Sequence, residues 1–120
     1  MELIDYASPF ASSLKMLILM LFAGHAMADF GLQSEYMSIV KSRYRDKPDH
    51  WFPVLWAHAL IHGGVVAAIT GSAILGMGEV ALHFVIDDCK SANRFGYGAD
   101  QALHYSCKIL WAVILFSALS

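Results

Sequence analysis

The chain has 120 residues, of which 58% are hydrophobic and 15% are charged, and its formal net charge is −2. Soluble domains contain roughly 45–50% apolar and about 25% charged residues, so the composition argues against a soluble globular protein and predicts an integral membrane protein. The small negative charge argues against a nucleic-acid binder, which would be strongly basic. The two cysteines do not suggest a disulfide framework.

A single membrane-embedded helical domain is expected over residues 1–120, because no break in composition divides the chain. The first helix should cover about residues 9–33, since Ser8 can cap it and Pro9 suits its first position. Its length of roughly 36 Å, at about 1.5 Å per residue, is enough to span a bilayer. His25 and Asp29, four residues apart, lie on one stripe near its C-terminal end.

The second helix should cover about residues 53–75, after a polar connection over residues 34–50. His58 and His62 lie four residues apart in an otherwise apolar sequence, so their ring nitrogens need a polar partner. We expect residues 76–78, Gly-Met-Gly, to form the turn that follows.

Two more helices are predicted, over about residues 79–91 and about residues 100–119. The third helix carries His83 and Asp87, and the fourth carries Asp100 and His104, again at a spacing of four. Every histidine in a predicted helix therefore has a histidine or an aspartate one turn away, and this recurrence is the main functional signal.

The predicted fold class is all-α, a four-helix up-and-down transmembrane bundle. The polar pair lies late in the first helix and early in the second and fourth helices, so antiparallel packing brings these pairs to the same end of the bundle. The pair on the third helix reaches the same level as the chain returns. We therefore expect all four pairs to converge on one layer.

The loops at this end hold six of the eight basic residues, while Glu2, Asp5 and Glu79 lie at the opposite end. By the positive-inside rule, the polar layer lies near the cytoplasmic face of a bacterial inner membrane and both termini lie outside. The six basic residues are Lys41, Arg43, Arg45, Lys47, Lys90 and Arg94.

Five imidazoles and three carboxylates at one depth offer more acceptors than donors, and a divalent cation would resolve this imbalance. Imidazole and carboxylate are the expected ligands of zinc, with iron and manganese as alternatives, and one or two ions are both open. The candidate metal ligands are His25, Asp29, His58, His62, His83, Asp87 and His104.

A bound metal can activate water, so we predict a metal-dependent membrane hydrolase with its site near the cytoplasmic interface. Asp100 would be a further ligand or the base that orients water, and Asp88 and Gln33 would support the site from outside. The expected partners are membrane lipids and an amphipathic or phosphorylated substrate, either a small molecule or a lipid. Self-association into a homo-oligomer is left open.

Three other functions stay open: a di-iron oxidase, a non-catalytic metal or proton carrier, and a structural or interaction protein. Plainer structural explanations also exist for each residue alone. A single histidine on an apolar face is more often a hydrogen-bonded core residue, Asp100 suits a helix N-cap, and Asp87 beside Asp88 suits a solvated helix end. The joint occurrence of the pairs favours metal binding.

The four motifs, HxxxD from His25, HxxxH from His58, HxxxD from His83 and DxxxH from Asp100, carry a resemblance to a known family. The sequence resembles uncharacterised small membrane proteins from bacteria and phages, a domain of unknown function, over about residues 25–108. That resemblance implies a common polar core rather than a particular reaction. A looser similarity is to membrane-bound metal-dependent hydrolases, which also place His and Asp on short membrane helices.

Overall fold

The computed structural model describes residues 2–120, and every regular element in this part of the chain is a helix. The prediction of an all-α protein is confirmed, with five α-helices and one short π-helix in place of four helices. The elements are α1 (Leu14–Ala26), the π-helix η1 (Met27–Gly31), α2 (Glu35–Val40), α3 (Trp51–Thr70), α4 (Ala73–Ser91) and α5 (Tyr97–Leu119).

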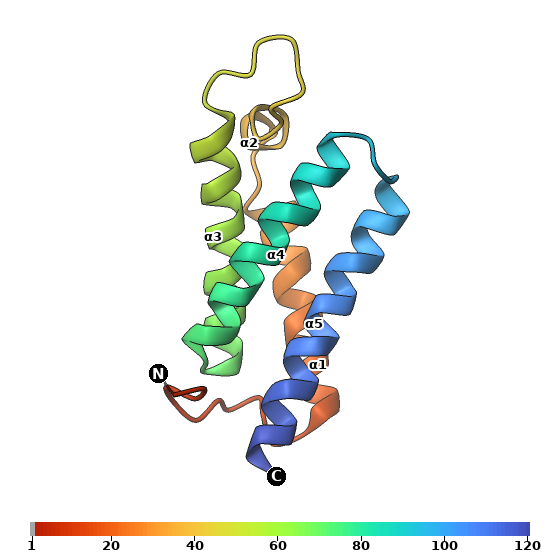
Figure 1. The fold of residues 1–120 in the computed structure, drawn as a ribbon. Helices are drawn as coiled ribbons and strands as arrows, with labels where there is room; N and C mark the ends of the chain where they lie inside the picture. The colour runs from red at the N-terminus through yellow and green to blue at the C-terminus, as the bar shows by residue number, and fades with distance from the viewer. Residues whose placement is uncertain (1) are drawn as a thin grey trace.

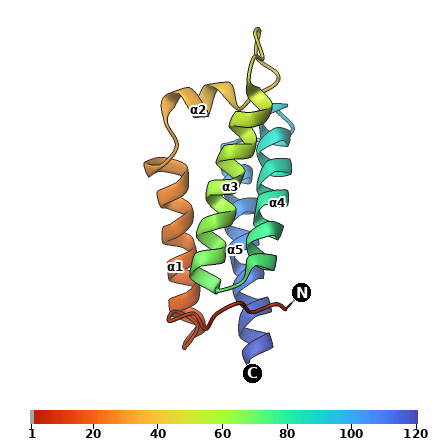
Figure 2. The same ribbon diagram turned by 90° about the vertical axis from the view of Figure 1, so that its left-hand side faces the viewer.

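The four long helices lie side by side and alternate in direction, with α1 and α4 running one way and α3 and α5 the other (Figure 1). Contacts join α1 to α3, α3 to α4, α4 to α5 and α5 back to α1, so the four helices form a closed ring. Both termini lie at one end, and the connections after α2 and α4 lie at the other (Figure 1). Helix α2 lies across this loop end (Figure 2).

Within residues 2–120, three segments are long and apolar enough to cross a membrane: Leu14–Gly31, Trp51–Thr70 and Tyr97–Leu119. Helix α4 is comparably long, at 19 residues, but four charged residues lower its hydropathy. These are Glu79, Asp87, Asp88 and Lys90.

Helix α1 begins at Leu14 rather than at Pro9, because Ser13 and not Ser8 provides its cap. The Ser13 Oγ accepts a hydrogen bond from the Met16 backbone N–H at 3.0 Å. The Ser8 hydroxyl is used elsewhere, since it donates to the Ile69 carbonyl at the end of α3. The segment before α1 therefore packs over the turn between α3 and α4.

The turn between α3 and α4 was predicted five residues too late. The chain turns at Gly71, where φ is 74°, a left-handed conformation that favours glycine. Ser72 then caps α4 by accepting from the Leu75 backbone N–H at 3.1 Å. Gly76 lies inside α4, where its carbonyl oxygen would be only 2.6 Å from a Cβ on Gly63 of α3. This glycine therefore serves close helix packing and not a turn.

The polar connection over residues 34–50 contains a short helix, α2, which Ser34 caps by accepting from the Met37 backbone N–H at 3.1 Å. Helix α5 begins at Tyr97, three residues earlier than predicted, after Gly96 as its N-cap. These corrections change helix ends and leave the order and direction of the long helices as expected.

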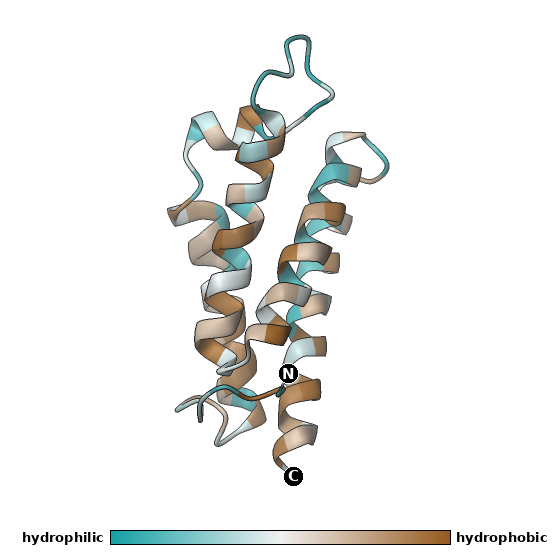
Figure 3. Ribbon diagram, turned by 60° about the vertical axis from the view of Figure 1, so that its left-hand side comes forward, coloured by the Kyte–Doolittle hydropathy of each residue, from teal (hydrophilic) through white to brown (hydrophobic). Residues whose placement is uncertain are grey.

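The interior has two parts along the bundle axis. Near the termini the buried side chains are apolar and include Leu17, Leu21, Val66 and Leu115. Toward the loop end the buried side chains include the histidines and aspartates of the predicted pairs, next to Leu55 and Ala59. In Figure 3 hydrophilic residues fill the loops at this end and continue along the helices below them, and others lie in the N-terminal segment at the opposite end. This division places a polar cluster in the half of the bundle next to α2.

Candidate metal centre

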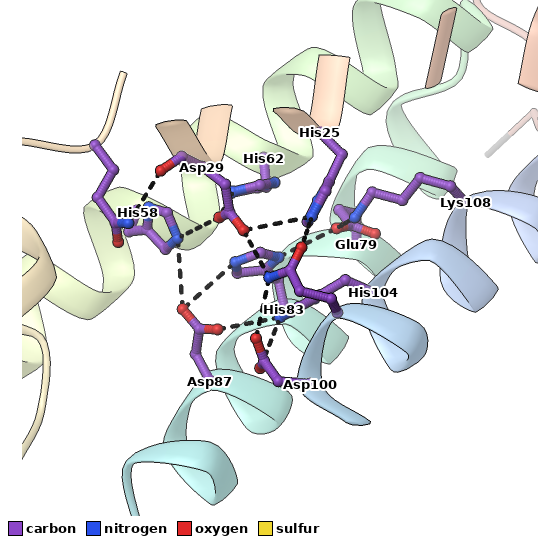
Figure 4. A network of polar contacts seen from close by, with 12 residues as sticks. His25, Asp29, His58, His62, Glu79, His83, Asp87, Asp100, His104 and Lys108 are labelled. Atoms are coloured by element: carbon purple, nitrogen blue, oxygen red, sulfur yellow. Dashed lines mark hydrogen bonds and ion pairs between the residues drawn. The ribbon is translucent and has the colours of Figure 1, made fainter. Parts of the chain in front are cut away.

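Ionisable side chains from all four long helices meet in the half of the bundle near the loops (Figure 4). The five helical histidines, Asp87 and Asp100 are each at most 4% exposed, and the Asp29 side chain is 11% exposed. The eight residues of the four predicted pairs therefore lie together, and we call them the His/Asp cluster. They are His25, Asp29, His58, His62, His83, Asp87, Asp100 and His104.

Asp29 joins the histidines of α1 and α3. It lies in η1, where the widened turn leads to a hydrogen bond from the Leu32 N–H to the Met27 carbonyl at 2.9 Å. The Asp29 Oδ1 lies 2.9 Å from His62 Nε2 and 3.3 Å from His58 Nε2. Its Oδ2 lies 3.4 Å from His25 Nε2.

Asp87 on α4 joins the other side of the cluster. Its Oδ1 lies 3.1 Å from His104 Nε2 on α5. Its Oδ2 lies 3.4 Å from His58 Nε2 and 3.5 Å from His83 Nε2. The two carboxylate oxygens therefore face different groups of imidazoles, as a carboxylate between two ions would do.

Asp100 also belongs to the cluster and is not a helix cap. Helix α5 begins before it, and its Oδ1 lies 3.3 Å from His104 Nε2. The Asp100 Oδ1 is buried and makes no hydrogen bond. The plainer explanation of Asp100 as an N-cap is therefore wrong.

In the part of the chain that the structure describes, three groups of ligand atoms lie close enough to hold an ion, with all atoms in each group within 4.8 Å of one another. His83 belongs to two of these groups, and so does His104, so the groups adjoin. The groups are Asp29, His58, His62 and His83; Glu79, His83 and His104; and Asp87, Asp100 and His104.

Several buried nitrogen and oxygen atoms of the His/Asp cluster have no hydrogen-bond partner and could bind a cation. Both ring nitrogens of His58 are buried without a hydrogen bond, although Nε2 lies within 3.4 Å of two carboxylate oxygens. The Nε2 of His83 is also buried without a hydrogen bond. Buried polar atoms are normally paired, so such atoms beside carboxylates suit a metal ion as their common partner.

Two predicted outer residues have different surroundings. Asp88 points away from the cluster and accepts from the Arg43 Nη2 at 2.9 Å on the surface, so it does not contact the residues that it was predicted to support. The Tyr44 hydroxyl and then Asp88 raise the pKa of Arg43 above its ordinary value through hydrogen bonds. Gln33 donates from Nε2 to the Asp29 backbone carbonyl at 3.1 Å, so it does support the turn that holds Asp29.

Glu79 is not at the opposite end of the bundle, as predicted, but is fully buried beside the cluster. Its Oε1 accepts from the Lys108 ammonium and lies 3.4 Å from His83 Nδ1. Its Oε2 accepts from the Trp111 indole N–H at 2.7 Å. The signal for Glu79 was present in the sequence, since it precedes His83 by four residues like the other pairs.

The contacts of two further residues could not be predicted from the spacing of residues within a helix. Gln101 on α5 donates from Nε2 to Asp29 Oδ2 and to Asp100 Oδ2, both at 3.2 Å, and its Oε1 lies 3.1 Å from His25 Nε2. Lys41, which follows α2, donates to Asp87 Oδ2 at 2.9 Å. From the sequence, Lys41 was predicted only as one of six basic residues in the loops.

The fold and the site define a small all-helical protein with an ionisable interior and three helices able to cross a membrane. The chain belongs to the family described as "Protein of unknown function (DUF3307)", whose model matches residues 16–120. This confirms the resemblance to an uncharacterised family. No curated protein and no solved structure matches the chain.

Proposed function

We propose that the protein is a metal-dependent hydrolase built as a four-helix transmembrane bundle, with its His/Asp cluster near the cytoplasmic face of a bacterial inner membrane. Zinc is the first candidate ion, and the substrate is an amphipathic or phosphorylated molecule. The observation that carries the proposal is the meeting of five buried imidazoles and three carboxylates from four helices.

The membrane location is supported by helices whose polar side faces inward. On α4 the buried residues include Glu79 and Asp87, while Met77 and Val85 are 53% and 56% exposed. A soluble helix shows the opposite arrangement, because its apolar face packs on the core. The described part of the chain, with its end loops, is 49 Å long, which is comparable to the about 40–45 Å of a bilayer with its headgroups.

The chemistry of such a site requires an ion, a water and a base. When bound, a divalent ion polarises the substrate and activates water for attack. In the hydrolysis that follows, one fragment of the substrate receives the hydroxyl group and the other receives the proton. Asp100 can accept this proton from the water and return it to the leaving group, because its buried Oδ1 has no hydrogen bond.

The distribution of polar and apolar side chains in the interior favours hydrolysis over transport of an ion across the bundle. The polar cluster occupies only the loop half, and the terminal half is filled by Leu17, Leu21, Leu75 and Leu115. The Glu79–Lys108 pair between these two parts is fully buried. An ion that enters from the loop end would therefore meet an apolar barrier before it reached the other side.

Metal content tests the binding half of this proposal. The detergent-purified chain should contain about one or two ions by elemental analysis, and His62→Ala should lose most of them because His62 belongs to the largest ligand group. His50→Ala is the matched control, since His50 lies in the exposed loop before α3. Equal metal in the wild type and His62→Ala would refute the proposed centre.

Turnover tests the catalytic half. Metal-loaded protein should release phosphate or fatty acid from bacterial polar lipids in mixed micelles, or p-nitrophenol from a p-nitrophenyl phosphate or ester. Asp100→Asn should keep most of the metal and lose about 100-fold or more in turnover, as expected for loss of a proton acceptor. Absence of turnover in the loaded wild type, together with metal flux into proteoliposomes, would favour a carrier instead.

A further inference from the structure

A cavity of about 350 Å³ opens at the loop end of the bundle and reaches the His/Asp cluster. Asp29, Asp87 and Asp100 form its inner wall, so a molecule in the cavity would touch two proposed metal ligands and the proposed proton acceptor. Phe30 and Tyr97 also line it, and they are 65% and 59% exposed. Cavities that bind small molecules have volumes of roughly 300–1,000 Å³, so this one is large enough for a substrate.

The outer wall of the cavity carries two ammonium groups and several neutral donors. Lys41 reaches in from the end of α2, and Lys90 from the last turn of α4. The hydroxyl groups of Ser38, Ser42 and Ser91 also line the cavity. Ammonium and hydroxyl groups arranged in this way suit the oxygens of an anion.

The charge of the cavity depends on the metal. Three carboxylates and two ammonium groups line it, which leaves one net negative charge. One divalent ion reverses this sign, and a second ion would increase the positive charge. The cavity should therefore repel an anion without metal and attract one with it.

Lys41 contacts a proposed metal ligand, so its position should differ between the metal-free and the metal-bound cavity. Its ammonium donates to Asp87 Oδ2, the same oxygen that lies within 3.5 Å of His58 and His83. A metal ion bound to Asp87 would compete for this oxygen and repel the ammonium, which can then turn into the cavity on its flexible stem. The Lys41 side chain is 15% exposed, so it already lies at the cavity surface.

We propose that this cavity binds the phosphate group of the substrate, with Lys41 as its main cationic ligand once the metal centre is loaded. This inference rests on the proposed function and names the substrate class and the recognition residue of the same site. A phosphate ester suits the cavity because its several oxygens can accept from the metal, two lysines and the serine hydroxyls together. The group can belong to a lipid headgroup or to a water-soluble ester.

Binding of phosphate probes to the purified chain tests the inference without relying on turnover. The protein is loaded with zinc, freed of excess ion by gel filtration and titrated with phenyl phosphate, or with phosphatidic acid in mixed micelles against phosphatidylcholine. The loaded wild type should bind at least one probe, and removal of the metal should abolish binding. Tighter binding of phenyl phosphate indicates a soluble ester, and tighter binding of phosphatidic acid indicates a lipid.

The Lys41→Met variant should keep its metal and bind the phosphate probe about tenfold more weakly, because a charge-assisted hydrogen bond is lost. Lys47→Met is the matched control in the same loop, outside the cavity, and should bind like the wild type. Lys90→Met, at an exposed position, should weaken binding by a smaller factor and provides a second variant if Lys41→Met fails to fold.

Two results would overturn the inference and leave the metal centre standing: metal-loaded wild type that binds neither probe, or lysine variants that bind as tightly as the wild type. A chain that binds no metal would overturn the proposed function and this inference together. Metal content is therefore measured on every sample, and it separates the two failures.

Discussion

Asp87 and Asp88 are neighbours in sequence with different surroundings. Asp87 is 4% exposed and faces His104 through one oxygen and His58 through the other. Asp88 lies on the surface in an ion pair with Arg43. One residue along a helix is a rotation of about 100°, so adjacent carboxylates face different environments. Substitutions of Asp87 and Asp88 therefore test the proposed metal centre, because only Asp87 contacts the histidines.

We predict that Asp87→Asn loses metal, because the amide removes the negative charge between the two groups of imidazoles. Its affinity for zinc should fall by at least the roughly 10- to 100-fold that loss of an outer partner costs. Competition with a zinc-binding dye measures this change. Asp88→Asn is the control and should bind zinc like the wild type; equal losses in both variants would contradict the assignment.

A second prediction concerns the buried ion pair of Glu79 and Lys108. Lys108→Met leaves the Glu79 carboxylate without its cation in an interior with few other donors. Loss of one partner of a buried pair costs about 3–5 kcal/mol, so the free energy of unfolding in detergent should fall by this order. The double variant Glu79→Gln/Lys108→Met should recover part of the loss; an unchanged single variant would show that the pair is dispensable.

At the scale of elements, α4 owes its position to glycines. A Cβ on Gly63 of α3 would lie 2.1 Å from the Val80 Cγ2 of α4, closer than atoms can approach. A Cβ on Gly76 of α4 would lie 2.7 Å from the Ala67 Cβ of α3. These contacts hold α3 and α4 close together at the level just below His62 and His83.

Gly63→Ala should therefore push α4 away from α3 and destabilise the protein by about 1–3 kcal/mol, as overpacking does. Thermal unfolding in detergent, with and without zinc, measures the effect. The neighbouring Gly64 faces open space, so Gly64→Ala should be neutral or slightly stabilising. If Gly63→Ala were as stable as Gly64→Ala, the close packing of the two helices would not matter for stability.

At the scale of the whole molecule, the two ends of the bundle differ in charge and in chain connectivity. Both termini lie at the apolar end, and the loop with Lys41, Arg43, Arg45 and Lys47 lies at the end of the cluster (Figure 1). In the proposed transmembrane bundle, the positive-inside rule would place the cavity on the cytoplasmic side. A phosphorylated substrate would reach the site from the cytoplasm or from the inner leaflet.

This topology predicts the labelling of single cysteines in intact cells. In a background in which Cys89 and Cys107 are replaced by serine, Ser120→Cys should react with an impermeant maleimide. Lys47→Cys should react only after the cells are permeabilised. The reverse pattern would invert the orientation, and labelling of both sites in intact cells would contradict a transmembrane bundle.

Much of the site could be predicted because the spacing of residues within a helix is local information. His58 with His62 and His83 with Asp87 must share a helix face once the helices form. Antiparallel order then brings pairs that lie late in one helix and early in the next to the same level. The predicted positions of Glu79 and of the helix ends were wrong because neighbouring serines are equally good helix caps and neighbouring glycines are equally good turn residues.

The sequence by itself determined that the protein is all-helical and strongly apolar, and that each histidine of the long helices has a histidine or an aspartate one turn away. These properties depend on composition and on helical periodicity. Only the tertiary structure decided that Ser8 donates to the Ile69 carbonyl instead of capping α1, that Glu79 is buried against Lys108, and that Lys41 and Gln101 reach the carboxylates. Those contacts join residues far apart in the chain, so they depend on which helix surfaces face each other, and no local pattern contains that information.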